Sequence, residues 1–138
     1  MPMFVTPLYA ALLALWFLLL SAVVIRHRGK SASPGDGGNS PLQRAIRGHA
    51  NFAEYVPLAL LMMAILELTR TSVYVLHALG IALLIGRILH GYTFAFSRRW
   101  QFGRTWGTVL TFVVLLAEAL LCLVVSMRGH DLWLRGLL

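Results

Sequence analysis

Four long apolar segments restrict the folds open to this sequence. The first runs from Phe4 to Ile25 without a charged residue, and the others span residues 49–68, 73–96 and 105–127. A helix that crosses a bilayer needs roughly 20 mostly apolar residues, because the hydrocarbon core is about 30 Å thick and the helix rises about 1.5 Å per residue. Each segment reaches that length. The sequence therefore predicts an all-α fold, an integral membrane four-helix bundle forming one domain over residues 1–138.

The composition supports a membrane protein over a soluble one. Apolar residues make up 59% of the 138 residues and charged residues only 12%, with a mean hydropathy of +0.76. Soluble domains carry about 25% charged residues. The net charge of +7 would suit nucleic acid, but the basic residues lie between the apolar segments, without the interleaved aromatic residues of a binding surface. We therefore expect no nucleic-acid partner.

The basic residues also predict the topology. One side of the membrane would carry the two connections that hold Arg26, Arg28, Lys30, Arg44, Arg47, Arg98, Arg99 and Arg104, and the other side only Arg70, Arg128 and Arg135. The positive-inside rule places the two basic loops in the cytoplasm and both termini on the opposite side. Residues 31–41, SASPGDGGNSP, predict a mobile cytoplasmic loop. The compact connections are typical of a multi-pass protein of a bacterial inner membrane.

A polar stripe opens the second segment. Arg47, Asn51 and Glu54 follow spacings of four and three, which places them on one helical face, with Tyr55 at its edge. A cation, an amide and a carboxylate complement a small zwitterion such as glutathione. In the alternative interpretation, Arg47 extends to lipid headgroups and Glu54 forms a structural ion pair with Arg87. Spacing alone leaves both interpretations open.

A second polar stripe lies in the third segment at the same depth. Arg87, His90 and Phe94 share one helical face. A charge inside a bilayer costs about 2.5 to 3.5 kcal/mol, so Arg87 must face protein or water. His90 taken alone is more typical of a hydrogen bond within the bundle than of catalysis, and no metal-ligand spacing surrounds it. The two stripes together indicate a site without a metal.

Other polar and small residues are expected to serve structure. For Glu118, deep in the fourth segment, we expect a hydrogen bond between helices, and for Cys122 a packing role. Glu67 and His77 flank the short connection near residues 68–72 and are expected to contact each other. Small residues at four-residue spacing favour close helix packing. These are Ala78, Ala82 and Gly86 in the third segment and Gly103, Gly107 and Thr111 in the fourth.

Two motifs are similar to those of a known membrane family. Residues 47–57 read RGHANFAEYVP and residues 86–94 read GRILHGYTF. The first resembles the opening of the second helix in the MAPEG family, the membrane-associated proteins in eicosanoid and glutathione metabolism. The second resembles the third-helix motif of the branch that contains microsomal prostaglandin E synthase and microsomal glutathione transferase. This resemblance implies a left-handed four-helix bundle that assembles as a homotrimer, with glutathione bound between subunits near the cytoplasmic face.

The resemblance also implies roles for individual residues. The positions that hold glutathione or line its pocket are Arg47, Asn51, Glu54, Tyr55, Arg87, His90 and Arg104. The implied mechanism activates the glutathione sulfur as a thiolate, and a cationic neighbour lowers the pKa of a thiol. Arg104 is the candidate for that catalytic cation, with Thr105 assisting. Phe94 stands where the prostaglandin-forming relatives carry a tyrosine, and Phe cannot donate a hydrogen bond, so prostaglandin synthesis is not expected.

Three functional hypotheses follow. The leading one is a glutathione transferase or peroxidase that uses glutathione as co-substrate against a hydrophobic lipid or xenobiotic electrophile dissolved in the membrane. The alternative is a non-catalytic lipid-binding protein of the same fold, against which the retained Arg47, Asn51 and Glu54 argue. A small multidrug antiporter relies on a membrane-embedded acid in its first helix, and the first segment here carries no charge.

Overall fold

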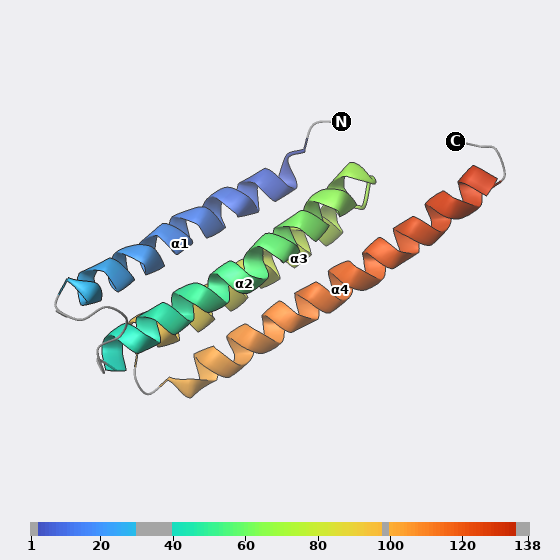
Figure 1. Ribbon diagram of the computed structural model, residues 1–138. Helices are drawn as coiled ribbons and strands as arrows, with labels where there is room; N and C mark the ends of the chain where they lie inside the picture. The colour runs from blue at the N-terminus through green and yellow to red at the C-terminus, as the bar shows by residue number, and fades with distance from the viewer. Residues whose placement is uncertain (1–2, 30–39, 98–99, 135–138) are drawn as a thin grey trace.

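The computed structural model describes residues 3–29, 40–97 and 100–134, which form four α-helices and no strand (Figure 1). The helices are α1 (Val5–Arg28), α2 (Ser40–Leu68), α3 (Val73–Ala95) and α4 (Gln101–Leu134). Each is long and apolar enough to cross a membrane. The predicted all-α fold with four membrane-spanning helices is confirmed.

Two helices extend beyond the segments that hydropathy marks. α2 begins at Ser40, ahead of the predicted start at His49, and α4 runs from Gln101 to Leu134 where residues 105–127 were expected. Apolarity marks only the part of a helix inside hydrocarbon, whereas polar turns continue the helix beyond it. Pro41 suits the first turn of α2, because the N–H that proline lacks would have no acceptor there. The rest of the predicted loop over residues 31–41 lies outside the described residues.

The helices pack around a central pair. The short connection between Leu68 and Val73 makes α2 and α3 an antiparallel hairpin. α1 and α4 each pack against both of these helices, but within the described ranges they do not contact each other. Figure 1 shows α1 and α4 on opposite outer sides, with the start of α1 and the end of α4 at the same end.

Glycines bring α3 and α4 into backbone contact. A Cβ atom added at Gly107 would lie 2.6 Å from the Gly86 carbonyl oxygen and 2.8 Å from the His90 backbone nitrogen. The Thr111 hydroxyl, fully buried beside them, donates to the Gly107 carbonyl at 2.8 Å. The predicted small-residue contact is therefore confirmed at Gly86, Gly107 and Thr111, and it sets how closely α4 approaches the polar residues of α3.

Polar bonds attach α1 to the hairpin. The Glu67 carboxylate accepts hydrogen bonds from the backbone N–H groups of Phe4, Val5 and Thr6 at 2.6, 2.8 and 2.7 Å. The Tyr9 hydroxyl lies 3.0 Å from Nδ1 of His77 and donates to the His77 carbonyl at 3.2 Å. Glu67 and His77 were expected to contact each other. The structure instead gives each of them a partner on α1.

Two further polar groups, a carboxylate and a thiol, lie on α4. Glu118 is fully buried, and neither carboxylate oxygen has a hydrogen-bond partner in the described part of the chain, so the expected bond between helices is not formed. The Cys122 thiol is free and half-buried, with its sulfur 4.0 Å from the Met62 carbonyl oxygen of α2. This contact agrees with the packing role predicted for Cys122.

Candidate functional site

The two predicted polar stripes line one cavity. It has a volume of about 320 Å³ and lies between the start of α2 and the end of α3, at the end of the molecule where the basic connections lie. The hairpin explains the convergence, because it brings the first half of α2 beside the last half of α3. The lining residues are Arg47, Ala50, Asn51 and Glu54 from α2 and His90 and Phe94 from α3.

Arg87 lies behind this cavity and holds Asn51 in place. Its side chain is only 1% exposed, and Nη1 donates to the Asn51 side-chain oxygen at 3.0 Å and to the Asn51 carbonyl at 3.4 Å. The guanidinium also stands 5.9 Å from the centre of the Tyr55 ring. Over the described residues Glu54 forms no ion pair with Arg87. The structural ion pair considered from the sequence is therefore replaced by a hydrogen bond to an amide.

The Arg87 bond determines which groups face a ligand. Because the Asn51 side-chain oxygen accepts from Arg87, the amide nitrogen of Asn51 is the group left to donate into the cavity. Arg47 and Glu54 are exposed at the cavity wall. The cavity thus offers one cation, one anion and one neutral donor to a small molecule with charges of both signs.

His90 closes the α3 side of the cavity. It is 5% exposed, and its ring centre lies 4.9 Å from that of Phe94. No hydrogen bond to the His90 ring is found among the described residues, so the expected bond within the bundle is not what holds it. His90 is therefore available to a ligand in the cavity.

A second, smaller cavity of about 110 Å³ lies on the other side of Phe94, which lines both. Gly48 allows this arrangement, since a Cβ atom there would stand 2.7 Å from the Phe94 Cβ. The other lining residues are Arg44, Thr93, Ser97, Gln101 and Arg104. The buried Nε atom of Arg44 has no hydrogen-bond partner in the part of the chain described. Arg104 thus reaches the site region from α4, separated from Asn51 and Glu54 by one aromatic ring.

Sequence reasoning did not select Arg44 as a site residue. Its spacing could have identified it, because Arg44 precedes Arg47 by three residues and so shares the helical face that leads to Asn51.

Three predicted site residues, Arg87, Tyr55 and Thr105, line neither cavity. The half-buried Tyr55 packs beside Arg87 and against Phe112 of α4, with ring centres 5.5 Å apart. The Thr105 hydroxyl is exposed and donates to the Gln101 carbonyl of its own helix at 3.2 Å. The structure therefore gathers Arg47, Asn51, Glu54 and His90 in one cavity. Arg87 and Tyr55 lie behind it, Arg104 beside it and Thr105 outside it.

The fold and the cavity together define a membrane protein of four spanning helices with a polar cavity at the start of its second helix. The model of the MAPEG family matches residues 6–124. The chain belongs to the MAPEG family and is a multi-pass membrane protein.

Among known proteins, the chain is similar to the inner membrane protein YecN of Escherichia coli strain K12. The two are 39% identical over 115 residues, which cover 80% of this chain and 88% of that protein. The YecN protein of Escherichia coli O6:H1 gives the same values. No solved structure matches the chain.

Proposed function

We propose that this protein is a membrane-bound glutathione-dependent transferase or peroxidase that acts on hydrophobic electrophiles. The observation that carries the proposal is the cavity in which Arg47, Asn51, Glu54 and His90 meet. Glutathione carries two carboxylates, one ammonium group, two amides and a thiol. Arg47 would pair with a carboxylate, Glu54 with the ammonium group, and the Asn51 amide nitrogen would donate to a carbonyl or carboxylate oxygen.

Activation of the sulfur requires a cation beyond these contacts. Arg104 is the candidate, because it borders the second cavity on the far side of Phe94. In the transfer step the thiolate attacks an electrophilic carbon, a C–S bond forms, and the leaving group departs with the electron pair. In the peroxidase reaction two glutathione molecules reduce a hydroperoxide to an alcohol and water and are oxidised to the disulfide. Thr105 remains a sequence-based candidate only, since its hydroxyl donates to its own helix.

The assembly and location form part of the same proposal. The cavity wall leaves Arg47 and Glu54 exposed on α2, which supports a homotrimer in which a neighbouring copy covers glutathione from that side. The similarity to YecN supports a bacterial inner membrane. The basic residues around the cavity support placing this end in the cytoplasm, with both termini on the opposite side.

Calorimetry with the detergent-purified protein tests the proposal. Wild-type protein should bind glutathione saturably and give an ultraviolet thiolate signal, whereas Arg47→Ala and Glu54→Ala should each weaken binding at least about tenfold. Arg128→Ala is the matched control, because Arg128 is an exposed arginine near the opposite end of α4.

Absence of binding at millimolar glutathione would refute the proposed transferase or peroxidase activity. The non-catalytic lipid-binding function would then become the better interpretation of this fold. Binding that Arg47→Ala and Glu54→Ala leave unchanged would show that glutathione occupies another site.

A further inference from the structure

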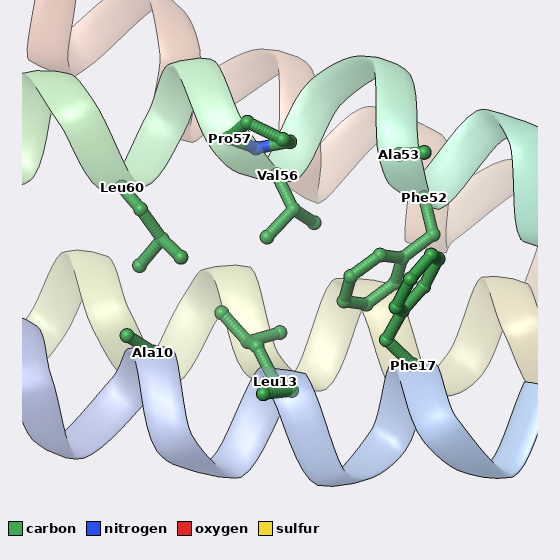
Figure 2. Close-up of a pocket in the computed structure, with 9 residues that line it drawn as sticks. Ala10, Leu13, Phe17, Phe52, Ala53, Val56, Pro57 and Leu60 are labelled. Atoms are coloured by element: carbon green, nitrogen blue, oxygen red, sulfur yellow. The ribbon is translucent and has the colours of Figure 1, made fainter.

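An apolar groove and the smaller cavity differ in what they offer a ligand. The groove, of about 360 Å³, runs between α1 and α2, where Leu13 and Phe17 point toward Val56 and Phe52 (Figure 2). Its lining residues carry no charge and no hydrogen-bonding side chain, so it gives a polar ligand nothing to bind. The smaller cavity, of about 110 Å³ beside Phe94, is the opposite, because two arginines line it and no acidic residue does.

The two cations of the smaller cavity are not neutralised. Within the described part of the chain neither Arg44 nor Arg104 forms an ion pair, and the buried Nε atom of Arg44 has no hydrogen-bond partner there. A buried donor without an acceptor is costly, and two positive charges that border one cavity repel each other. The cavity therefore lacks a negatively charged acceptor.

The start of α4 adds to the positive field. α4 begins at Gln101, which lines the cavity, and its first turn contains no acidic residue. The first N–H groups of a helix have no acceptor within it, and the helix dipole places partial positive charge there. Gly103 brings this turn close to α3, since a Cβ atom there would lie 2.6 Å from the Thr93 hydroxyl oxygen. The Ser97 hydroxyl and the Gln101 amide add two neutral donors.

The size of the cavity selects a small anion. Thr93 is part of the wall and not a donor to a ligand, because its buried hydroxyl donates to the Leu89 carbonyl at 3.0 Å. A water molecule takes about 30 Å³ in the liquid, so this cavity admits roughly four groups of that size. A phosphate group fits this space, whereas glutathione is far too large. Gln101 and Arg104 are exposed and leave the cavity open at the surface.

Exposed aromatic residues place the cavity at the depth of lipid headgroups. Trp100, Phe102 and Trp106 lie at the start of α4, with successive ring centres 6.4 and 5.8 Å apart. Tryptophan is enriched where a membrane meets water. Arg44 and Arg104 border the cavity at the same end of the bundle, so they lie where phosphate is present both in lipid headgroups and in solution.

We propose that the smaller cavity binds a phosphate group between the guanidinium groups of Arg44 and Arg104. The group is inorganic phosphate or the phosphomonoester headgroup of a membrane lipid, which present the same terminal oxygens. A guanidinium pairs with two phosphate oxygens at once, and Ser97 and Gln101 donate to the others. Because Arg104 is also the cation proposed to hold the thiolate, bound phosphate would compete with it. This consequence alone rests on the proposed function.

Calorimetry with the detergent-purified full chain, in the absence of glutathione, tests the inference. Inorganic phosphate and short-chain phosphatidic acid are titrated separately. We expect saturable binding with a Kd on the order of 1 mM or tighter. If phosphatidic acid binds at least about tenfold more tightly than inorganic phosphate, the ligand is a lipid headgroup. Equal or weaker binding of phosphatidic acid identifies free phosphate as the ligand.

Matched variants separate this cavity from a general attraction of anions to the basic end. Arg44→Gln should weaken phosphate binding about tenfold. Arg47→Gln removes the same charge one helical turn away, in the polar cavity, and should weaken phosphate binding less than about twofold. Ser97→Leu keeps both cations but fills the cavity, so it should weaken binding as strongly as Arg44→Gln does.

Thermal unfolding followed by circular dichroism shows that the variants are folded. Without phosphate, Arg44→Gln should melt no lower than the wild type, because it removes a buried donor that has no acceptor among the described residues. Saturating phosphate should raise the melting temperature of the wild type but not that of Arg44→Gln, since a ligand stabilises only the protein that binds it.

Two results would overturn the inference. One is the absence of saturable binding of both inorganic phosphate and phosphatidic acid. The other is equal weakening by Arg44→Gln and Arg47→Gln, which would reduce the effect to diffuse attraction by the basic end. None of these readouts uses glutathione, so a failure of the inference and a failure of the proposed function are distinguishable.

Discussion

The Glu67 carboxylate joins the last turn of α2 to the first turn of α1. It accepts from the N–H groups of Phe4, Val5 and Thr6 at 2.6 to 2.8 Å. The first N–H groups of a helix have no acceptor within the helix, and the helix dipole favours a negative charge beside them. The N-cap residue Phe4 supplies no side-chain acceptor of its own. We therefore expect Glu67→Gln to destabilise the protein by loosening α1.

The magnitude follows from the three bonds. Losing an N-cap costs about 0.5 to 2 kcal/mol, and a hydrogen bond to a charged group contributes about 1.5 to 3 kcal/mol. Glutamine keeps one neutral acceptor and turns an NH₂ group toward the remaining donors. Because Glu67 is half-buried, we expect a loss near the upper end of the N-cap range, about 2 kcal/mol. For a chain of this size the melting temperature should fall by about 6 to 10 °C.

Thermal unfolding of the detergent-solubilised protein, followed by circular dichroism, measures the effect. Glu54→Gln is the matched control, because Glu54 is an exposed carboxylate on the same helix without a hydrogen-bond partner among the described residues. Its melting temperature should stay within about 1 °C of the wild type, as for most surface substitutions. If Glu67→Gln melts together with this control, the carboxylate does not hold α1 and the reasoning is wrong.

The remaining predictions concern the helix contact and the cavity. Gly107→Ala should destabilise by about 1 to 3 kcal/mol, because the new Cβ would lie 2.6 Å from a carbonyl oxygen of α3. Gly129→Ala, with nothing within 4 Å of the new Cβ, should instead raise the melting temperature, because alanine favours a helix over glycine by about 1 kcal/mol. If both variants shift the melting temperature in the same direction, the close contact between Gly107 and Gly86 does not limit the packing of α3 and α4. Arg87→Met should weaken glutathione binding about tenfold in calorimetry, because Asn51 loses the donor that orients it, and unchanged affinity would argue against that role. Arg104→Ala should retain glutathione binding but lose the ultraviolet thiolate signal, and a surviving signal would assign thiolate stabilisation to another group.

The cavity could be predicted from the sequence because the hairpin fixes the depth of its residues. Leu68 and Val73 flank the turn, and both helices rise equally per residue, so positions equally distant from the turn share a depth. Asn51 matches His90 in this way. Apolar length identified the helices, and the three-and-four spacing identified the polar faces. These signals are local in sequence, which is why they were sufficient for α2 and α3.

The hydrogen-bond partner of each polar side chain could not be predicted, because it depends on the direction of the side chain and not on its depth in the membrane. Glu54 stands at the same depth as Arg87, yet the guanidinium reaches the Asn51 oxygen at 3.0 Å. Glu67 and His77 both bond to α1, whose position across the bundle no local pattern records. Close approach of backbones also decides contacts: Gly48 allows Phe94 to stand between the two cavities.

The polar cavity and the apolar groove lie on the two flanks of one helix. Asn51 and Glu54 line the cavity beside α3, whereas Ala53 and Val56 line the groove beside α1. Within one copy of the chain, a helix about 10 Å across therefore separates the proposed glutathione site from the groove. Ala14→Trp, which fills the groove, should leave glutathione affinity in calorimetry at the wild-type value, and a loss of affinity would show that the groove and the cavity are coupled.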